Sequence, residues 1–231
     1  MASTADTTAR LFERLCGEVP AFGSGSGFVL VAVDGVDGSG KSTFADALAA
    51  ELRRQGRDVV LIRADDFHNL REVRYRRGRD SPDGFWLDSY DYAALEHDAL
   101  EPFGPGGDGR YRSIATDLSR DCRVTSPLRS ARPGTVAIVE GLFLHRDELS
   151  RWWDYSVFLD VPFEVTAARM AVRDGTPADP GHPKMRRYVE GRRLYFRACA
   201  PWARATRVVD NSDARRPAVR LPFEAAAASG R

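Results

Sequence analysis

The sequence predicts an α/β fold in which helices flank a mostly parallel sheet. Two observations support this fold class. Short apolar segments of strand length alternate along the chain with segments whose apolar residues recur at helical spacing. A glycine-rich loop directly follows the first apolar segment, as expected where a strand turns tightly into a helix. Such alternation favours right-handed crossovers and places ligands at the carboxyl ends of the strands.

The elements are expected in the following order. A short helix over 7–17 carries Leu11, Phe12 and Leu15 at helical spacing, and the glycine- and serine-rich stretch 23–27 ends that pattern. Buried strands are expected at 28–33, 58–63, 135–140, 155–160 and 207–210. Helices are expected at 44–52, 92–100, 162–173 and 184–199. The tail over 212–231 is predicted to be flexible.

The composition indicates one domain. A chain of 231 residues with 43% hydrophobic residues can bury one sizeable core, so residues 1–231 are read as a single domain with its core at about 28–211. Its 34 basic and 33 acidic residues give a formal charge of +1, which does not mark the whole protein as a binder of nucleic acid or membrane surfaces. No apolar run has the length of a membrane span.

The cysteines and the N-terminus favour a cytoplasmic protein. Cys16, Cys122 and Cys199 are odd in number and far apart, which argues against a disulfide framework and against a zinc site. The first twenty residues lack the apolar core of a signal peptide. A homo-oligomer remains compatible with the sequence.

Residues 35–43 form the strongest motif, a phosphate-binding loop with the pattern G-x-x-x-x-G-K-S. In such a loop, main-chain N–H groups and a helix N-terminus hold the phosphates of a nucleoside triphosphate. Lys41 would reach the outer phosphates, and Ser42 would offer its hydroxyl to Mg²⁺. Only two of the 34 basic residues are lysines, Lys41 and Lys184, so a lysine at this position is a specific choice. The predicted ATP-binding residues are Gly35, Asp37, Gly38, Ser39, Gly40, Lys41, Ser42 and Thr43.

Acidic residues follow two of the other predicted strands. Asp65 and Asp66 come after the second strand, and Asp65 would reach the sheet edge where the phosphates bind. A carboxylate there suits a base that takes a proton from an acceptor hydroxyl, although an aspartate after a strand can equally cap a turn. Glu140 ends the apolar strand that precedes Gly141, a place from which it can orient Mg²⁺ directly or through water.

Several segments together resemble the uridine kinase and phosphoribulokinase family. The resemblance runs from about residue 28 to 211 and rests on the phosphate-binding loop and on the segments 65–68, 88–92, 139–144, 168–174 and 210–211. It implies a P-loop NTPase fold of the nucleoside monophosphate kinase type, with a lid at about 174–187. It also implies an ATP- and Mg²⁺-dependent kinase whose acceptor is a hydroxyl of a small molecule, with no nucleic acid or membrane as partner.

The resemblance also implies roles for single residues. Asp65 matches the catalytic aspartate, Ser42 and Glu140 match the magnesium positions, and Asp65 is a further candidate for the metal site. Arg169 and Arg173 lie four residues apart on one helix face, from which they would close over the triphosphate as catalytic residues.

Acceptor recognition is the part of the resemblance with the most departures. Asp88 falls where uridine kinases hold the ribose diol, or it caps a helix in place of Asp91. Tyr111 matches a base contact, or it is an exposed strand tyrosine in a hairpin. His68 is expected in the acceptor pocket, at a position where the family usually has a tyrosine. Leu87 and the pair Thr116 and Asp117 fall where an aromatic residue and a histidine are usual.

Several functions therefore stay open. The leading one is phosphorylation of the 5′-hydroxyl of a pyrimidine nucleoside, and the alternative acceptors are a sugar, a sugar phosphate or a vitamin precursor such as pantothenate. A regulatory GTPase is excluded because neither lysine lies in an N-K-x-D motif. A nucleic-acid-binding ATPase is suggested only by the arginines over 71–79 around Tyr75, which are more simply read as a phosphate-facing or solvated loop.

Overall fold

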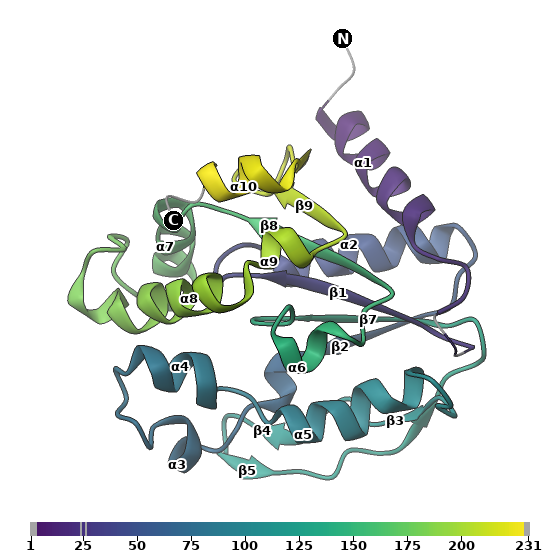
Figure 1. The fold of residues 1–231 in the computed structure, drawn as a ribbon, viewed down its shortest axis with the longest axis horizontal. Coiled ribbons are helices and arrows are strands. Elements are labelled where there is room, and N and C mark those ends of the chain that lie inside the picture. The colour runs from purple at the N-terminus through teal and green to yellow at the C-terminus, as the bar shows by residue number, and fades with distance from the viewer. Residues whose placement is uncertain (1–3, 24, 26, 229–231) are drawn as a thin grey trace.

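The computed structural model describes residues 4–23, 25 and 27–228, and a six-stranded sheet lies at its centre (Figure 1). The strand order is β10-β9-β8-β1-β7-β2. Every neighbouring pair is parallel except β10 and β9, which are antiparallel. The predicted fold class, a mostly parallel sheet flanked by helices, is confirmed.

The strands of this sheet are β1 (Val29–Gly35), β2 (Val59–Arg63), β7 (Val136–Gly141), β8 (Tyr155–Asp160), β9 (Arg207–Asp210) and β10 (Ala218–Arg220). Two small antiparallel ribbons pair β3 (Arg110–Tyr111) with β6 (Arg129–Ser130) and β4 (Thr116–Asp117) with β5 (Cys122–Arg123). The longer helices are α1 (Thr4–Glu18), α2 (Lys41–Arg54), α7 (Phe163–Asp174) and α8 (Arg186–Cys199). The shorter α-helices are α3 (Arg71–Arg74), α4 (Pro82–Asp88), α5 (Tyr92–Leu95), α6 (Asp147–Ser150), α9 (Pro201–Arg204) and α10 (Pro222–Ala228). Four further turns of helix are η1 (Ala64–Phe67), η2 (Glu96–Leu100, a π-helix that continues α5), η3 (Glu101–Phe103) and η4 (Pro183–Met185).

Apolar side chains on both faces of the sheet build two cores. Val31 and Val33 of β1 pack on one face with residues of α1 and α2, and Leu30 and Ala32 pack on the other face with residues of the helices that cover it, including α4 and α8. All seven residues of β1 are buried. Strands covered on both faces read as continuous apolar runs, which is why the sequence pattern located them.

The C-terminal segment differs from the prediction. Residues 212–231 were expected to form a flexible tail, but β10 adds an antiparallel edge strand to β9 and α10 follows it, with Ala225 fully buried in the core. A three-residue edge strand is held by main-chain hydrogen bonds and has no apolar period to detect. Residues 229–231 lie outside the described part of the chain.

The carboxyl ends of the parallel strands bring three connections to one edge of the sheet. They are the loop between β1 and α2, the turn η1 after β2, and the segment after β7. This edge therefore gathers the predicted phosphate-binding loop, Asp65 and Glu140. No helix in the described ranges is both long and apolar enough to cross a bilayer.

Candidate active site

The loop between β1 and α2 depends on two glycines. Gly38 and Gly40 have φ angles of 74° and 90°, a region that side chains other than glycine rarely adopt. A Cβ at Gly38 would lie 2.6 Å from the carbonyl oxygen of Thr166 on α7, and one at Gly40 would lie 2.8 Å from Nδ2 of Asn211. The loop is therefore pressed against α7 and the end of β9, and larger residues at either position would displace it.

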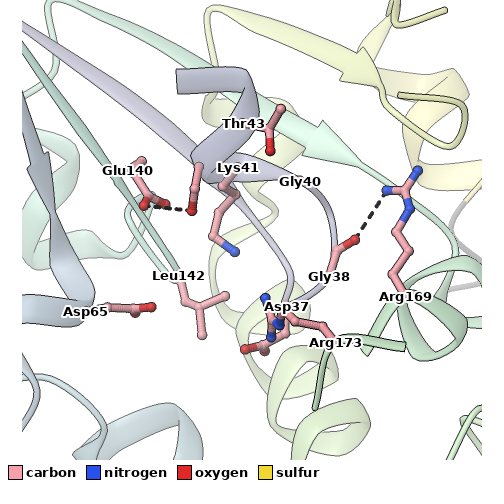
Figure 2. Close-up of a pocket in the computed structure, with 11 residues that line it drawn as sticks. Asp37, Gly38, Gly40, Lys41, Thr43, Asp65, Glu140, Leu142, Arg169 and Arg173 are labelled. Atoms are coloured by element: carbon pink, nitrogen blue, oxygen red, sulfur yellow. Dashed lines mark hydrogen bonds between the residues drawn. The ribbon is translucent and has the colours of Figure 1, made fainter. Parts of the chain in front are cut away.

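Two side chains fasten this loop to the end of β9. Asn211 donates from Nδ2 to the carbonyl oxygen of Ser39 at 2.7 Å. Arg169 donates to the carbonyl oxygens of Gly38 and Ser39 at 3.2 and 3.4 Å (the Gly38 bond is dashed in Figure 2), and to those of Asn211 and Ser212 at 2.9 Å. The guanidinium predicted to act on the triphosphate is thus already bonded to four main-chain carbonyls, so it also shapes the loop.

A third fastening joins the loop to α8. Asp37 accepts a hydrogen bond of 2.7 Å from Arg192, whose side chain is 1% exposed. Burial alone would raise the pKa of Asp37, but the charges of Arg192, Lys41 and Arg173 outweigh it and hold the pKa below its ordinary value. Asp37 is therefore an ionised anchor of the loop. The prediction had assigned it only to ATP binding and had not identified Arg192.

The loop between β1 and α2 lines a cavity of about 390 Å³, which we call the phosphate cavity (Figure 2). Its lining combines loop residues with residues from η1, the end of β7 and α7. These are Asp37, Gly38, Gly40, Lys41, Ser42, Thr43, Asp65, Glu140, Leu142, Arg169 and Arg173. Lys41 donates from Nζ to the carbonyl oxygen of Val36 at 3.0 Å, within the loop itself. Gly35 and Ser39, the other two predicted loop residues, belong to the loop but do not line this cavity.

Ser42 and Glu140 face one another in this cavity. The Ser42 hydroxyl donates to Oε1 of Glu140 at 2.9 Å, and Nε of Arg63 lies 3.6 Å from the same oxygen. The Glu140 side chain is only 6% exposed, and this burial raises its pKa above the ordinary value despite Lys41 and Ser42. A buried carboxylate beside a hydroxyl supplies the oxygen ligands that a hard divalent cation such as Mg²⁺ prefers. Ser42 and Glu140 are thus the residues that would hold it.

Asp65 enters the cavity from η1, directly after β2. The hydroxyl of Tyr90 donates to its Oδ1 at 2.7 Å and so orients the carboxylate. Burial, with the charge of Asp65 added, raises the pKa of Tyr90 well above its ordinary value, so Tyr90 keeps the proton that it donates. Figure 2 shows Asp65 and Lys41 directed into the same cavity. Tyr90 lies in a motif that the sequence indicated, but its contact with a residue 25 positions away left no sequence signal.

His68 lies next to Asp65 but is not among the residues that line the phosphate cavity. Its Nδ1 atom is 2.7 Å from the carbonyl oxygen of Asp65, and its ring packs against Tyr90 with a centroid separation of 4.5 Å. Thr116 donates to the His68 carbonyl oxygen at 2.7 Å. The structure therefore brings His68 and Thr116 together beside Asp65, and the acceptor role of His68 stays a prediction.

The structure does not bring Asp88 into the phosphate cavity. Its side chain is 1% exposed and is paired with Arg76 and with Nε of Arg77, the latter at 2.9 Å. Burial would raise the pKa of Asp88, but these two arginines lower it. The Asp88 carboxylate, which was expected to bind a ribose diol, thus forms ion pairs with two arginines instead. Asp91 is the residue that caps α5, accepting from the Ala94 N–H at 3.0 Å.

Tyr111 is also placed elsewhere. It is 6% exposed and packs on Phe103 at 5.2 Å, and Phe103 packs on Phe28 at 5.4 Å, at the amino end of β1. The phosphate-binding loop begins at the other end of this seven-residue strand, roughly 20 Å away at the usual rise per residue. The prediction of Tyr111 as a base contact is therefore corrected: it is a core residue at the opposite edge of the sheet.

Arg173 lines the phosphate cavity, as expected for a residue one turn after Arg169. Its guanidinium also pairs with Asp174 at 2.7 Å, and the side chain is 63% exposed. Residues 175–182 follow without helix or strand before η4. A lid at about 174–187 stays a prediction.

The chain is similar to known proteins in both sequence and fold. A family model described as an AAA domain matches residues 31–193. A uridine kinase of Shewanella piezotolerans is 32% identical over 151 residues, which cover 63% of this chain and 68% of that protein. A structure described as a possible uridine kinase from Bacillus stearothermophilus superposes with a TM-score of 0.68 at 23% identity, covering 87% of this chain and 98% of that one. A Silicibacter protein, provisionally described as a kinase of a fructose transport system, superposes with a TM-score of 0.59 at 26% identity, covering 86% and 96%.

Proposed function

Because the chain belongs to the uridine kinase-like family of P-loop kinases, we propose that it transfers the γ-phosphoryl group of ATP to the 5′-hydroxyl of a pyrimidine nucleoside. The general class, an ATP-dependent kinase, follows from the family itself. The observation that carries the proposal is the placement of the Asp65 carboxylate opposite Lys41 in the phosphate cavity, with Tyr90 holding it in position. The choice of a pyrimidine nucleoside is supported by the relatives named uridine kinase.

Each part of phosphoryl transfer has a candidate residue here. The main-chain N–H groups of the loop and Lys41 would bind the outer phosphates and offset the charge that builds up in the transition state. Asp65 would accept the proton of the acceptor hydroxyl while the hydroxyl oxygen forms a new bond to the γ-phosphorus. The bond between the γ-phosphorus and the oxygen that bridges it to the β-phosphate breaks at the same time and releases ADP. Mg²⁺, when held by Ser42 and Glu140, supplies charge to the phosphate oxygens.

A panel of acceptors tests this proposal. Purified protein with ATP and Mg²⁺ is incubated with uridine, cytidine, purine nucleosides, sugars, sugar phosphates and pantothenate, and ADP release is measured. We expect release with uridine or cytidine. The variant Asp65→Asn should lose at least about 100-fold in kcat, because a base contributes roughly 10²–10⁴-fold.

Asp66→Asn is the matched control. Asp66 is the neighbouring carboxylate, it does not line the phosphate cavity, and burial raises its pKa. Its replacement should leave most of the activity. Full activity of Asp65→Asn, or an equal loss of kcat in both variants, would show that Asp65 is not the base.

A sugar or sugar phosphate is the second candidate acceptor. One specific observation favours it: Asp88, the residue expected to bind a ribose diol, is buried in ion pairs with Arg76 and Arg77. The similarity to the Silicibacter protein points the same way. ADP release with sugars but with no nucleoside in the panel would select this alternative.

A further inference from the structure

Asp37 is a carboxylate of the phosphate cavity that has no task in the reaction proposed above. The cavity is also lined by Glu140, which with Ser42 would hold Mg²⁺, and by Asp65, the proposed base. The pairing of Asp37 with Arg192 anchors the loop, but an anchor does not need to face the cavity as well. The position of Asp37 therefore points to a ligand contact.

The pairing with Arg192 leaves one oxygen of Asp37 free. Arg192 donates from Nε at 3.2 Å and from Nη2 at 2.7 Å, and both bonds end on Oδ2 of Asp37. An arginine often spreads two such bonds over both oxygens of a carboxylate, which does not happen here. Within the described ranges, no hydrogen bond reaches Oδ1. The Asp37 side chain is 19% exposed and lines the cavity, so Oδ1 can receive a ligand there.

The phosphates of the donor are not suitable partners for this oxygen. Asp37, paired with the cation of Arg192, is ionised. An ionised carboxylate only accepts hydrogen bonds, and its negative charge repels the phosphate oxygens. A hydroxyl group is a suitable donor, and the acceptor of the phosphoryl group is a compound that carries hydroxyls.

The cavity wall between Asp37 and Asp65 also fits such a compound. Figure 2 shows Leu142 between the two carboxylates, and all three side chains line the same cavity. An apolar side chain flanked by two hydrogen-bond acceptors suits a carbon skeleton that carries two hydroxyls. Asp88, the carboxylate expected to bind a diol, lies outside this cavity in ion pairs with two arginines.

We propose that Asp37 determines acceptor specificity: its Oδ1 accepts a hydrogen bond from a second hydroxyl of the acceptor while the reacting hydroxyl lies at Asp65. The acceptor must then carry at least two hydroxyls. In a pyrimidine nucleoside, the second one is a ring hydroxyl of the ribose. This contact departs from the one at Asp88 that the family resemblance implies. The inference rests on the proposed function in one respect, that Asp65 receives the reacting hydroxyl.

A comparison of two substrates in two proteins tests this contact. Uridine and 2′,3′-dideoxyuridine both carry the 5′-hydroxyl, but only uridine carries the ring hydroxyls. The unmodified protein should favour uridine in kcat/KM by about 10- to 100-fold, the range for a hydrogen bond to a charged group. In Asp37→Asn the amide oxygen can still bind Arg192, which leaves the amide N–H₂ toward the cavity. The preference for uridine should then fall to within about threefold.

This preference separates a contact with the acceptor from a purely structural role. If Asp37 only anchors the loop, Asp37→Asn lowers kcat/KM for both substrates alike and the preference stays. The double variant Asp37→Asn/Arg192→Met has no unpaired buried charge and replaces the single variant if that one folds poorly. Asp88→Asn is the matched control, because it alters the carboxylate that was expected to bind the diol. Its preference for uridine should equal that of the unmodified protein.

The proposal is overturned if the unmodified protein uses uridine and 2′,3′-dideoxyuridine equally well, or if the preference survives in Asp37→Asn. Loss of the preference in Asp88→Asn alone would assign the contact to Asp88 instead. If the acceptor panel selects a sugar, the same comparison uses that sugar and its monodeoxy analogues. At least one analogue should then show the pattern expected for dideoxyuridine, and its absence from all of them overturns the proposal. Phosphorylation of no compound in the panel would contradict the kinase function itself, and this inference with it.

Discussion

At the scale of single residues, the buried Tyr90 hydroxyl donates a hydrogen bond to Asp65, the proposed catalytic base. Tyr90→Phe removes that hydroxyl and little else. Because hydrogen bonds to charged groups contribute about 1.5–3 kcal/mol, we expect kcat to fall roughly 10- to 100-fold while the KM for ATP stays the same. Steady-state kinetics with the acceptor found in the panel measures both values. An unchanged kcat, or a change confined to the KM for ATP, would show that Tyr90 does not position the base.

The proposed role of Glu140 needs an ionised carboxylate, and that charge should lower the stability of the folded protein. Its pKa is raised by burial above the ordinary value of 4.5, so the folded protein holds the proton more tightly than the unfolded chain does. The ionised carboxylate therefore lowers stability, and this cost grows as the pH rises from about 4.5 through the folded pKa.

The variant Glu140→Gln tests this opposition. It should unfold at a higher temperature than the unmodified protein at pH 7–8, with the difference shrinking toward pH 4.5. A gain of about 1 kcal/mol would appear as ~2–4 °C in Tm. The variant should also lose the stabilisation by Mg²⁺ with ADP. A lower Tm at every pH would mean that Lys41, Ser42 and Arg63 already compensate the charge.

At the scale of elements, α8 holds the phosphate-binding loop through the buried pair of Arg192 and Asp37. Removing one partner of a buried pair leaves an unpaired charge and typically costs about 3–5 kcal/mol. We expect Arg192→Met to lose that much in urea unfolding, and Asp37→Asn in the same chain to restore part of it. Arg193→Ala, an exposed neighbour, should cost less than about 1 kcal/mol. Equal costs at positions 192 and 193 would contradict an anchoring role for the pair.

The sequence could predict features that depend on neighbouring residues, but not contacts between residues far apart in the chain. The predicted strands at 155–160 and 207–210 have the observed bounds, and the other three predicted strands are within two residues of them, because apolar runs are local features. The loop could be identified because its glycines and Lys41 all fall within residues 35–41. Arg192 pairs with Asp37 across 155 positions, and the three residues of β10 carry no period, so neither could be read from a local pattern. Asp88 and Tyr111 were assigned by resemblance to the family. That resemblance could not show that Asp88 is paired with arginines or that Tyr111 is buried in the core.

At the scale of the whole molecule, one sheet supports both halves of the proposed reaction. β1 leads into the loop proposed to bind the donor, and β7 beside it carries Glu140. The next strand, β2, leads into the turn that carries Asp65. Helices α1 and α2 share a core on one face of this sheet, and α4 and α8 contribute to the core on the other (Figure 1). The two cores pack on opposite faces of the same strands. Loss of packing in one core would therefore expose strands on which the other core also depends.

One cooperative unfolding transition is therefore expected for the whole chain. Probes at Trp86 in one core and at a reporter dye placed on α1 should give the same Tm, as two-state behaviour requires. ADP with Mg²⁺ at about 100 times its Kd should add ~2.7 kcal/mol and move this single transition upward by roughly 5–10 °C. Calorimetry measures the shift, and 1 M NaCl without nucleotide serves as the control for a general salt effect. Two transitions, only one of which responds to nucleotide, would show that the chain is not a single domain and that the donor site belongs to one part of it.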